Sequence, residues 1–146
     1  MISELLIAAL IVLLGGYWFR YNCLAILRAR IAPELAGQIS AANDLSFLEV
    51  HGRLEDNPGT AGLDALNRAL LRDYQVLTCL LRYTAPAAHT AEHRMLMLDF
   101  QFMQLRYFLA RRHLRRTAHA SLEECARILN HFAGALGART ASSLRA

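Results

Sequence analysis

Two histidines four residues apart, His89 and His93 in the segment HTAEH, have the spacing in this sequence that best fits metal binding. On a helix they would share one face, and two imidazoles on one face can ligate a metal ion. The segment differs from HExxH, so it lacks the glutamate that activates a zinc-bound water in metalloproteases. A further ligand would have to come from elsewhere, such as His51 or Asp64, and no spacing brings these together. We therefore interpret the pair as polar residues beside a loop.

The other histidines suggest a second cofactor chemistry. His113, His119 and His131 lie in the C-terminal third, and each is of the type that serves as an axial haem ligand in helical bundles. No CxxCH segment accompanies them. We expect no cofactor and no metal site. A His-ligated metal or haem-binding helical bundle is retained as an alternative function.

Motifs of nucleophilic or phosphate chemistry are absent from the sequence. It has no Gly-rich phosphate loop, no GxSxG and no paired carboxylates, and acids stand near Arg at helical spacing, as Asp64 and Arg68 do. The cysteines are odd in number, widely separated and outside any CxxC, which favours free thiols in a reducing compartment. They are Cys23, Cys79 and Cys125. The sequence predicts neither an enzyme nor a small-molecule substrate.

The basic residues form the remaining constellation. All sixteen are Arg, which we interpret as the mark of a GC-rich, bacterial genome, and half of them lie in residues 106–146. The segment RYFLARRHLRR would place four of them within roughly 140° of one helix side. They are Arg111, Arg112, Arg115 and Arg116. Cations near a helix C-terminus explain them simply. A membrane-tethered basic module binding nucleic acid or acidic proteins is the alternative, although Tyr107 and Phe108 fit a core better than a base-stacking platform, which disfavours nucleic acid.

The N-terminal segment predicts a membrane anchor within residues 1–27. Residues 5–19, LLIAALIVLLGGYWF, carry no charge. As a helix they span about 22 Å, short of the roughly 30 Å of bilayer hydrocarbon. Ile2 and residues 21–27 extend the span, with Arg20 reaching the headgroups. The anchor residues are Leu5, Leu6, Ile11, Leu14, the interfacial aromatics Tyr17 and Trp18, and Arg20.

Three other interpretations of this segment compete with the anchor. A cleaved signal peptide would have a basic start and a small-residue cleavage site, whereas Glu4 precedes the apolar run and YWFRYN follows it. A core helix of a soluble protein fits the marginal length. The start Glu4-Leu5-Leu6-Ile7 resembles the mature N-terminus of type IV pilins over fewer than ten residues, but the rest lacks the strand pattern that this family implies. The anchor is preferred.

The charges flanking the anchor predict its orientation. Arg20, Arg28 and Arg30 follow the apolar run, and only the amino group and Glu4 precede it. Positive residues favour the cytoplasmic side. We expect a single-pass protein of the inner (cytoplasmic) membrane, with the N-terminus outside and the C-terminal domain in the cytoplasm.

The rest of the chain predicts an all-α fold: a three- to four-helix bundle over residues 28–137 and a frayed tail over 138–146. Pro33 and Asn43 leave residues 21–55 as one bent helix or two short ones, and EDNPGTAG at 55–62 is a turn. A helix over 61–83 carries an apolar stripe of Leu63, Leu66, Leu70, Tyr74, Leu77 and Leu81. After a break at 84–86 a third helix is expected over 87–117. A last helix begins at Ser121, which forms a capping box with Glu124, and ends at Gly134 and Gly137.

The third helix carries apolar stripes on two opposed faces. One comprises Met95, Leu98, Phe102, Leu105 and Leu109, and the other comprises Leu96, Phe100, Met103, Tyr107 and Leu114. Such a helix lies centrally in its own bundle or gives one face to a partner. We expect Leu96, Phe100, Met103 and Tyr107, with the four Arg, to bind the partner.

The expected function is a non-catalytic accessory or scaffold subunit that contacts the bilayer and other subunits of a membrane complex. The position of the Arg run depends on residues 21–55. If they lead away from the membrane, the run lies ~40 Å from the bilayer at 1.5 Å per residue. If Asn43 marks a hairpin, the run lies near the headgroups.

Overall fold

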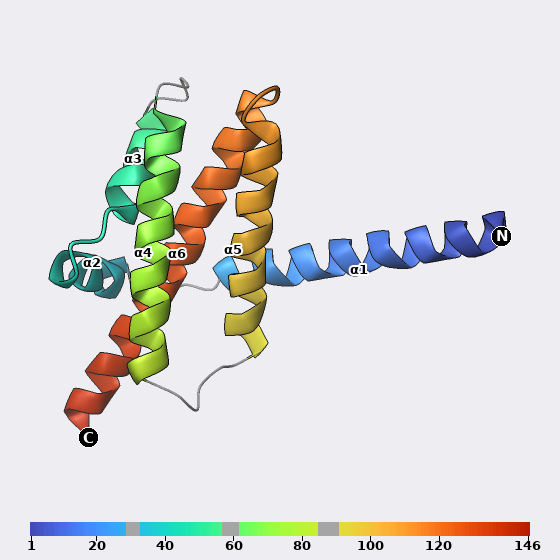
Figure 1. The fold of residues 1–146 in the computed structure, drawn as a ribbon. Helices are drawn as coiled ribbons and strands as arrows, with labels where there is room; N and C mark the ends of the chain where they lie inside the picture. Colours follow the sequence, from blue (N-terminus) through green and yellow to red (C-terminus); the bar gives the residue numbers. More distant parts are fainter. Residues whose placement is uncertain (29–32, 57–61, 85–90) are drawn as a thin grey trace.

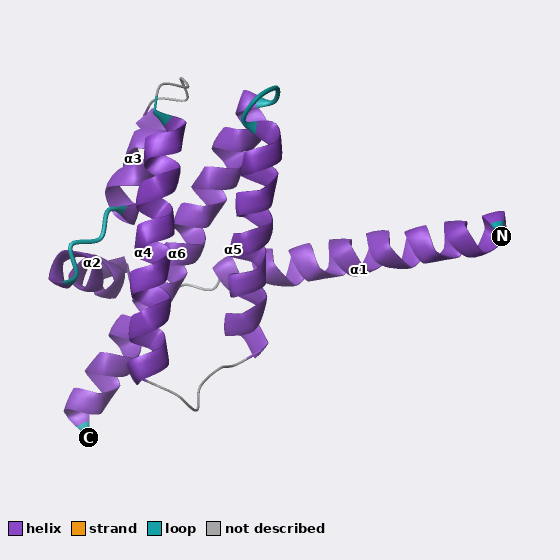
Figure 2. Ribbon diagram, in the orientation of Figure 1, coloured by secondary structure: helices purple, strands orange, loops and turns teal. Residues whose placement is uncertain are grey.

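The computed structural model describes residues 1–28, 33–56, 62–84 and 91–146, and all regular structure in these ranges is α-helical (Figures 1 and 2). In chain order the helices are α1 (Ile2–Arg28), α2 (Pro33–Ala42), α3 (Phe47–Asp56), α4 (Leu63–Thr84), α5 (Ala91–Ala110) and α6 (Arg115–Arg145). The all-α class and the long N-terminal apolar helix are confirmed. Five helices follow α1 in the described ranges, where three to four were expected.

α1 has two parts with different surroundings. Its N-terminal part projects away from the bundle, and its C-terminal end reaches the bundle beside α5 (Figure 1). Cys23 is buried there, and Phe19, Ile26 and Leu27 pack against the core. The C-terminal end of α1 is therefore part of the bundle, and its N-terminal part is exposed.

α6 is the central helix of the bundle, because it contacts each of the other five helices. The face predicted from its apolar spacing is buried throughout: Leu122, Cys125, Ile128, Leu129, Phe132 and Leu136. Small residues on the same helix allow close approach. A Cβ on Gly137 would lie 2.8 Å from the Leu35 Cβ atom, so α2 packs directly on the α6 backbone at this point.

The predicted bounds of the last helix were wrong at both ends. α6 begins at Arg115, so Ser121 is a buried residue inside it, and its hydroxyl donates a hydrogen bond to the Thr117 carbonyl (2.7 Å). Gly134 and Gly137 do not end the helix; both are buried, and α6 continues to Arg145. Residues 138–145 of the expected frayed tail are therefore helical. Small residues here serve close packing, and the chain continues as helix past them.

The bounds of the other helices agree with the prediction to different degrees. α4 closely matches the helix predicted over 61–83, with Leu70, Leu77 and Leu81 buried. Residues 33–56 form two short helices, and α2 begins at Pro33 as expected of a first turn. The helix expected over 87–117 ends at Ala110. The turn at 55–62 and the break at 84–86 fall largely on residues 57–61 and 85–90, outside the described residues.

Candidate functional site

The exposed part of α1 is the first candidate functional feature. α1 is long and apolar enough to cross a membrane, and within the described residues it is the only helix of this kind; a signal sequence would share these properties. None of its most apolar window is buried, so the alternative of a soluble core helix is wrong. Every predicted anchor residue before Arg20 is exposed: Leu5, Leu6, Ile11, Leu14, Tyr17 and Trp18.

Arg20, at the base of this exposed segment, is held by two acids of the bundle. Its Nη1 atom lies 3.0 Å from Asp99 Oδ1 on α5 and also donates to Glu124 Oε1 on α6. Its Nη2 atom donates to Glu124 Oε2 at 2.6 Å. The expectation that Arg20 extends to the lipid headgroups is corrected, because bidentate carboxylate contacts direct its guanidinium into the bundle. We call Arg20, Asp99 and Glu124 the base clamp.

The base clamp is a largely buried ionic cluster that joins three helices, and its Arg20 side chain is 27% exposed. The Asp99 side chain is fully buried, and that of Glu124 is 13% exposed. Burial raises the pKa of Asp99 while the Arg20 guanidinium opposes the rise. One cation faces two carboxylates, so both acids depend on Arg20 for compensation. Sequence reasoning missed Asp99 and assigned Glu124 to a cap; the available signal was Asp99 itself, an acid between the two apolar stripes in the middle of α5.

The two apolar faces of α5 have opposite environments. The side chains chosen as a partner surface, Leu96, Phe100, Met103 and Tyr107, are buried in the bundle core. They are therefore not accessible to a partner in this fold, because α6 packs along α5. In the other stripe Met95 packs against the core, and the remaining members are exposed. Phe108 extends this exposed surface, as does Leu114, which lies in the turn after α5 and had been assigned to the first stripe. We call this exposed set the α5 outer face: Leu98, Phe102, Leu105, Phe108, Leu109 and Leu114.

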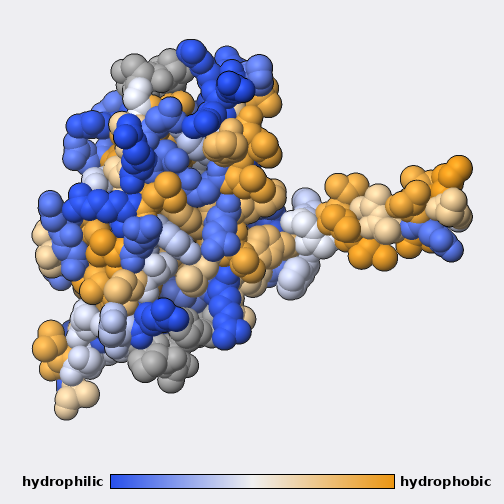
Figure 3. All heavy atoms as spheres, viewed as in Figure 1, coloured by the Kyte–Doolittle hydropathy of each residue, from blue (hydrophilic) through white to orange (hydrophobic). Residues whose placement is uncertain are grey.

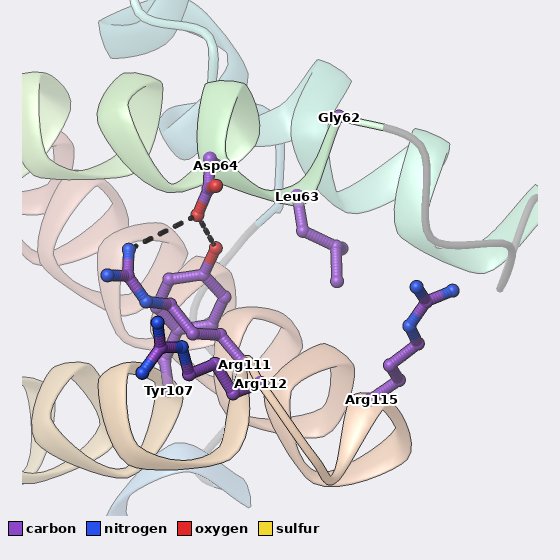
Figure 4. Close-up of a pocket in the computed structure, with 7 residues that line it drawn as sticks. All are labelled: Gly62, Leu63, Asp64, Tyr107, Arg111, Arg112 and Arg115. Carbon is purple, nitrogen blue, oxygen red and sulfur yellow. Dashed lines mark hydrogen bonds and ion pairs between the residues drawn. The ribbon is translucent and has the colours of Figure 1, made fainter.

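Three arginines line a polar hollow of about 420 Å³ at the end of α5 (Figure 4). The Tyr107 hydroxyl donates a hydrogen bond to Asp64 on α4, and Arg111 Nη1 lies 3.8 Å from the same carboxylate oxygen. Burial raises the pKa of Tyr107, and the Asp64 carboxylate adds to this rise. The other lining residues are Gly62, Leu63, Arg112 and Arg115. The hollow presents more positive than negative charge to an incoming group.

The predicted Arg run does not lie along one helix side. Arg111 and Arg112 fall in the turn after α5, while Arg115 and Arg116 form the first turn of α6. Arg116 does not line the hollow. The interpretation of all four as cations complementing a helix C-terminus is thus wrong for Arg115 and Arg116, which stand at the positive end of a helix dipole. That arrangement strengthens the local positive potential.

The described histidines have separate surroundings. His93 is buried and its ring lies 4.5 Å from that of Phe132, while His119 Nε2 lies 2.8 Å from the Leu54 carbonyl oxygen. Burial lowers the pKa of His131. His89 lies outside the described residues, and within the described ranges no three His, Cys, Asp or Glu side chains are grouped as metal ligands. The pairing of His89 with His93 is therefore untested.

Comparison with known proteins adds no relative: no protein-family model, curated protein or solved structure matches the chain significantly.

Proposed function

We propose that this chain is a non-catalytic, single-pass membrane accessory subunit, in which α1 crosses the membrane and the bundle of α2–α6 presents contact surfaces to other subunits. The supporting observation is the base clamp. A helix that only tethers a domain needs no fixed angle to it, and a flexible linker suffices. Here α1 continues unbroken into the bundle and is ion-paired to α5 and α6 through Arg20. A fixed angle between anchor and bundle would hold the contact surfaces of the bundle at a defined distance from the membrane and in a defined orientation, as a subunit of an assembly needs.

The first experiment tests membrane insertion and retention of α1. The full chain is expressed, membranes are washed with alkaline carbonate, and the retained protein is weighed by intact-mass spectrometry. We expect the uncleaved chain in the membrane pellet, because an exposed apolar helix of this length partitions into hydrocarbon. Leu10→Arg with Leu13→Arg is the matched variant and should move the chain to the wash. A chain shortened at its N-terminus, or wild-type chain in the wash, contradicts the proposal.

Orientation can be tested with a native reporter. Cys79 is exposed, whereas Cys23 and Cys125 are buried. A membrane-impermeant maleimide should label Cys79 in lysed cells and leave it unlabelled in intact ones, because the positive flank places the bundle in the cytoplasm. Cys79→Ser is the control for background labelling. Equal labelling of intact and lysed cells would place the bundle outside.

Assembly is tested on the native complex. Mild detergent extraction followed by native mass spectrometry should give this chain in fixed ratio with other membrane proteins. The same ratio must persist through a second, orthogonal separation. A monodisperse monomer in both separations would refute the accessory-subunit role while leaving the anchor intact.

The Arg-lined hollow favours a second candidate function, a membrane-tethered module for acidic protein segments or nucleic acid. Its support is the convergence of Arg111, Arg112 and Arg115 around one space. Salt-sensitive retention on heparin, lost when Arg111, Arg112, Arg115 and Arg116 are changed to Gln, would favour this candidate. Retention that is unchanged in the variant would count against it.

A further inference from the structure

We infer that the α5 outer face lies on the anionic surface of the membrane that α1 crosses, with its apolar side chains at the boundary between headgroups and acyl chains. This inference rests on the proposed membrane insertion of α1. It adds a second membrane contact, made by a helix that lies along the surface instead of crossing it.

The level of α5 relative to the bilayer follows from the base clamp. Residues 2–18 of α1 are exposed and span about 25 Å at 1.5 Å per residue, which nearly fills the hydrocarbon layer. The next residue, Phe19, is the first that packs against the bundle. Arg20 is bonded to Asp99, which lies in the middle of α5. The middle of α5 therefore lies at headgroup level, beside the interfacial aromatics Tyr17 and Trp18.

The direction of α5 keeps its whole length near this level. α5 runs across α1 instead of continuing its course (Figure 1). Figure 3 shows hydrophobic residues along the edge of α5 that faces the side on which α1 projects. The exposed fractions of Leu98, Phe102 and Leu105 all exceed one half. A plane through the base of α1, perpendicular to that helix, would thus run along these side chains.

Charge on this helix matches an anionic surface. The exposed charged side chains of α5 are Glu92 in its first turn, Arg94 and Arg106, because Asp99 is buried in the base clamp. The Arg-lined hollow follows at the end of the same helix. Arg111 directly follows α5, about 18 Å along the helix from Asp99, so on this inference these cations lie at the level of α5 and not ~40 Å from the bilayer. Leu and Phe on one face with Arg at its edges is the pattern of helices that lie in the interface.

The α5 outer face also contains a shallow apolar groove of about 260 Å³. Phe102, Leu105, Leu109 and Leu114 line it, and Arg106 stands among them. Apolar walls beside a guanidinium suit the glycerol and upper acyl region of an anionic phospholipid next to its phosphate. A protein partner would explain why this face is apolar, but it would not explain why the face lies level with the base of α1. A lipid surface accounts for both features.

The test measures depth in the full chain reconstituted into vesicles of phosphatidylcholine and phosphatidylglycerol. The exposed native thiol is removed by Cys79→Ser. A single new cysteine is then introduced and labelled with an environment-sensitive fluorophore: Leu105→Cys on the α5 outer face, Leu10→Cys in α1, or Leu71→Cys on α4 as an exposed control. Quenching is compared between lipids with a spin label near the headgroup and lipids with it near the end of the acyl chain.

We expect the Leu105 probe to be quenched most by the headgroup-proximal label, at a depth of about 5–10 Å. The Leu10 probe should be quenched most by the deep label, and the Leu71 probe by neither. Quenching at Leu10 without quenching at Leu105 overturns the inference and leaves the anchor standing. No quenching at Leu10 refutes the anchor itself. A Leu105 probe shielded from aqueous iodide but not quenched by lipid would show that a second copy of the chain covers the face, which also overturns the inference.

A second set of measurements tests whether the α5 outer face requires anionic lipid. Arg94→Gln with Arg106→Gln should reduce quenching at Leu105 in vesicles containing phosphatidylglycerol, and pure phosphatidylcholine should reduce it in the parent protein. Unchanged quenching in both comparisons overturns the assignment of an anionic surface.

Discussion

Replacing Arg20 with Met removes the cation of the base clamp while keeping most of the volume of its aliphatic stem. Asp99 and Glu124 would then share a desolvated site with no compensating charge. The protein can respond by keeping Asp99 protonated in the folded state, since burial already raises the pKa of this carboxyl with Arg20 present. The cost of that response sets the size of the effect.

The magnitude follows from linkage. An unfolded aspartic acid titrates near 3.9, and each pH unit above this value costs about 1.4 kcal/mol when the folded state holds the proton. The expected loss of unfolding free energy is therefore about 4 kcal/mol at pH 7, within the range measured when one partner of a buried ion pair is removed. At pH 5 the same reasoning gives about 1.5 kcal/mol. The folded state binds more protons than the unfolded state, so the variant loses stability as pH rises.

Denaturant unfolding of the full chain in mild detergent, followed by circular dichroism at pH 5 and pH 7, measures both values. Arg82→Met on α4 removes an exposed guanidinium and is the matched control; it should change stability little at either pH. Adding Asp99→Asn to Arg20→Met should restore part of the loss and flatten its pH dependence, because the buried group can no longer ionise. A loss below about 1 kcal/mol that is the same at both pH values would show that Arg20 faces the headgroups instead, as the sequence had suggested.

Three other predictions test the packing. Gly137→Ala should destabilise the bundle by about 1–3 kcal/mol in denaturant unfolding, because the new Cβ meets Leu35 at 2.8 Å. Gly52→Ala, in open space on α3, is its control and should stabilise by about 0.5–1 kcal/mol. Under native conditions at pH 8 a thiol reagent should label Cys79 alone, since Cys23 and Cys125 are buried and burial raises the pKa of Cys125 to about 12; native labelling of Cys125 would contradict the packing of α5 on α6. Asp73→Ala removes the carboxylate that accepts the Ser46 backbone N–H at 2.7 Å at the start of α3, and it should cost about 1–2 kcal/mol, against almost nothing for exposed Asp56→Ala.

Local pattern was sufficient where an element carries one apolar face. α4 could be predicted nearly to its ends because Leu70, Leu77 and Leu81 recur at helical spacing between turn-forming segments. α1 could be predicted from its uncharged length. In both cases the signal lies within the element itself.

Local pattern failed where tertiary packing sets the structure. Nothing in the segment LARRHLRR disfavours helix, since Leu and Arg are both good helix formers, yet the chain turns after Ala110 so that α6 can pack back along α5. Gly137 was interpreted as a helix end because glycine commonly occupies that position, whereas here it makes room for α2. The choice between the two α5 stripes had the same cause: both have helical spacing, and only the position of α6 decides which is buried.

The base clamp could not be predicted because its members come from three helices far apart in sequence. Arg20 is the sole charge between Glu4 and Arg28, which favoured a residue at the membrane boundary. The composition of the sequence indicates how far along α1 the membrane boundary lies, and it places Arg20 at that boundary. The direction in which the Arg20 side chain points depends on its pairing with Asp99, which only the fold reveals.

Insertion of α1 and orientation of the bundle relative to the membrane can be separated experimentally, because they depend on different parts of α1. The apolar residues of α1 determine whether it inserts, while the base clamp determines how the bundle is turned once it has inserted. The double variant Arg20→Met with Asp99→Asn removes the clamp without leaving Asp99 ionised and buried. In the vesicle assay it should keep full deep quenching of the Leu10 probe and lose much of the headgroup-proximal quenching of the Leu105 probe. Arg82→Met should leave both probes unchanged. If the Leu105 probe keeps its depth in the double variant, the α5 outer face is held at the membrane by its own lipid contacts, and the clamp stabilises the bundle without orienting it.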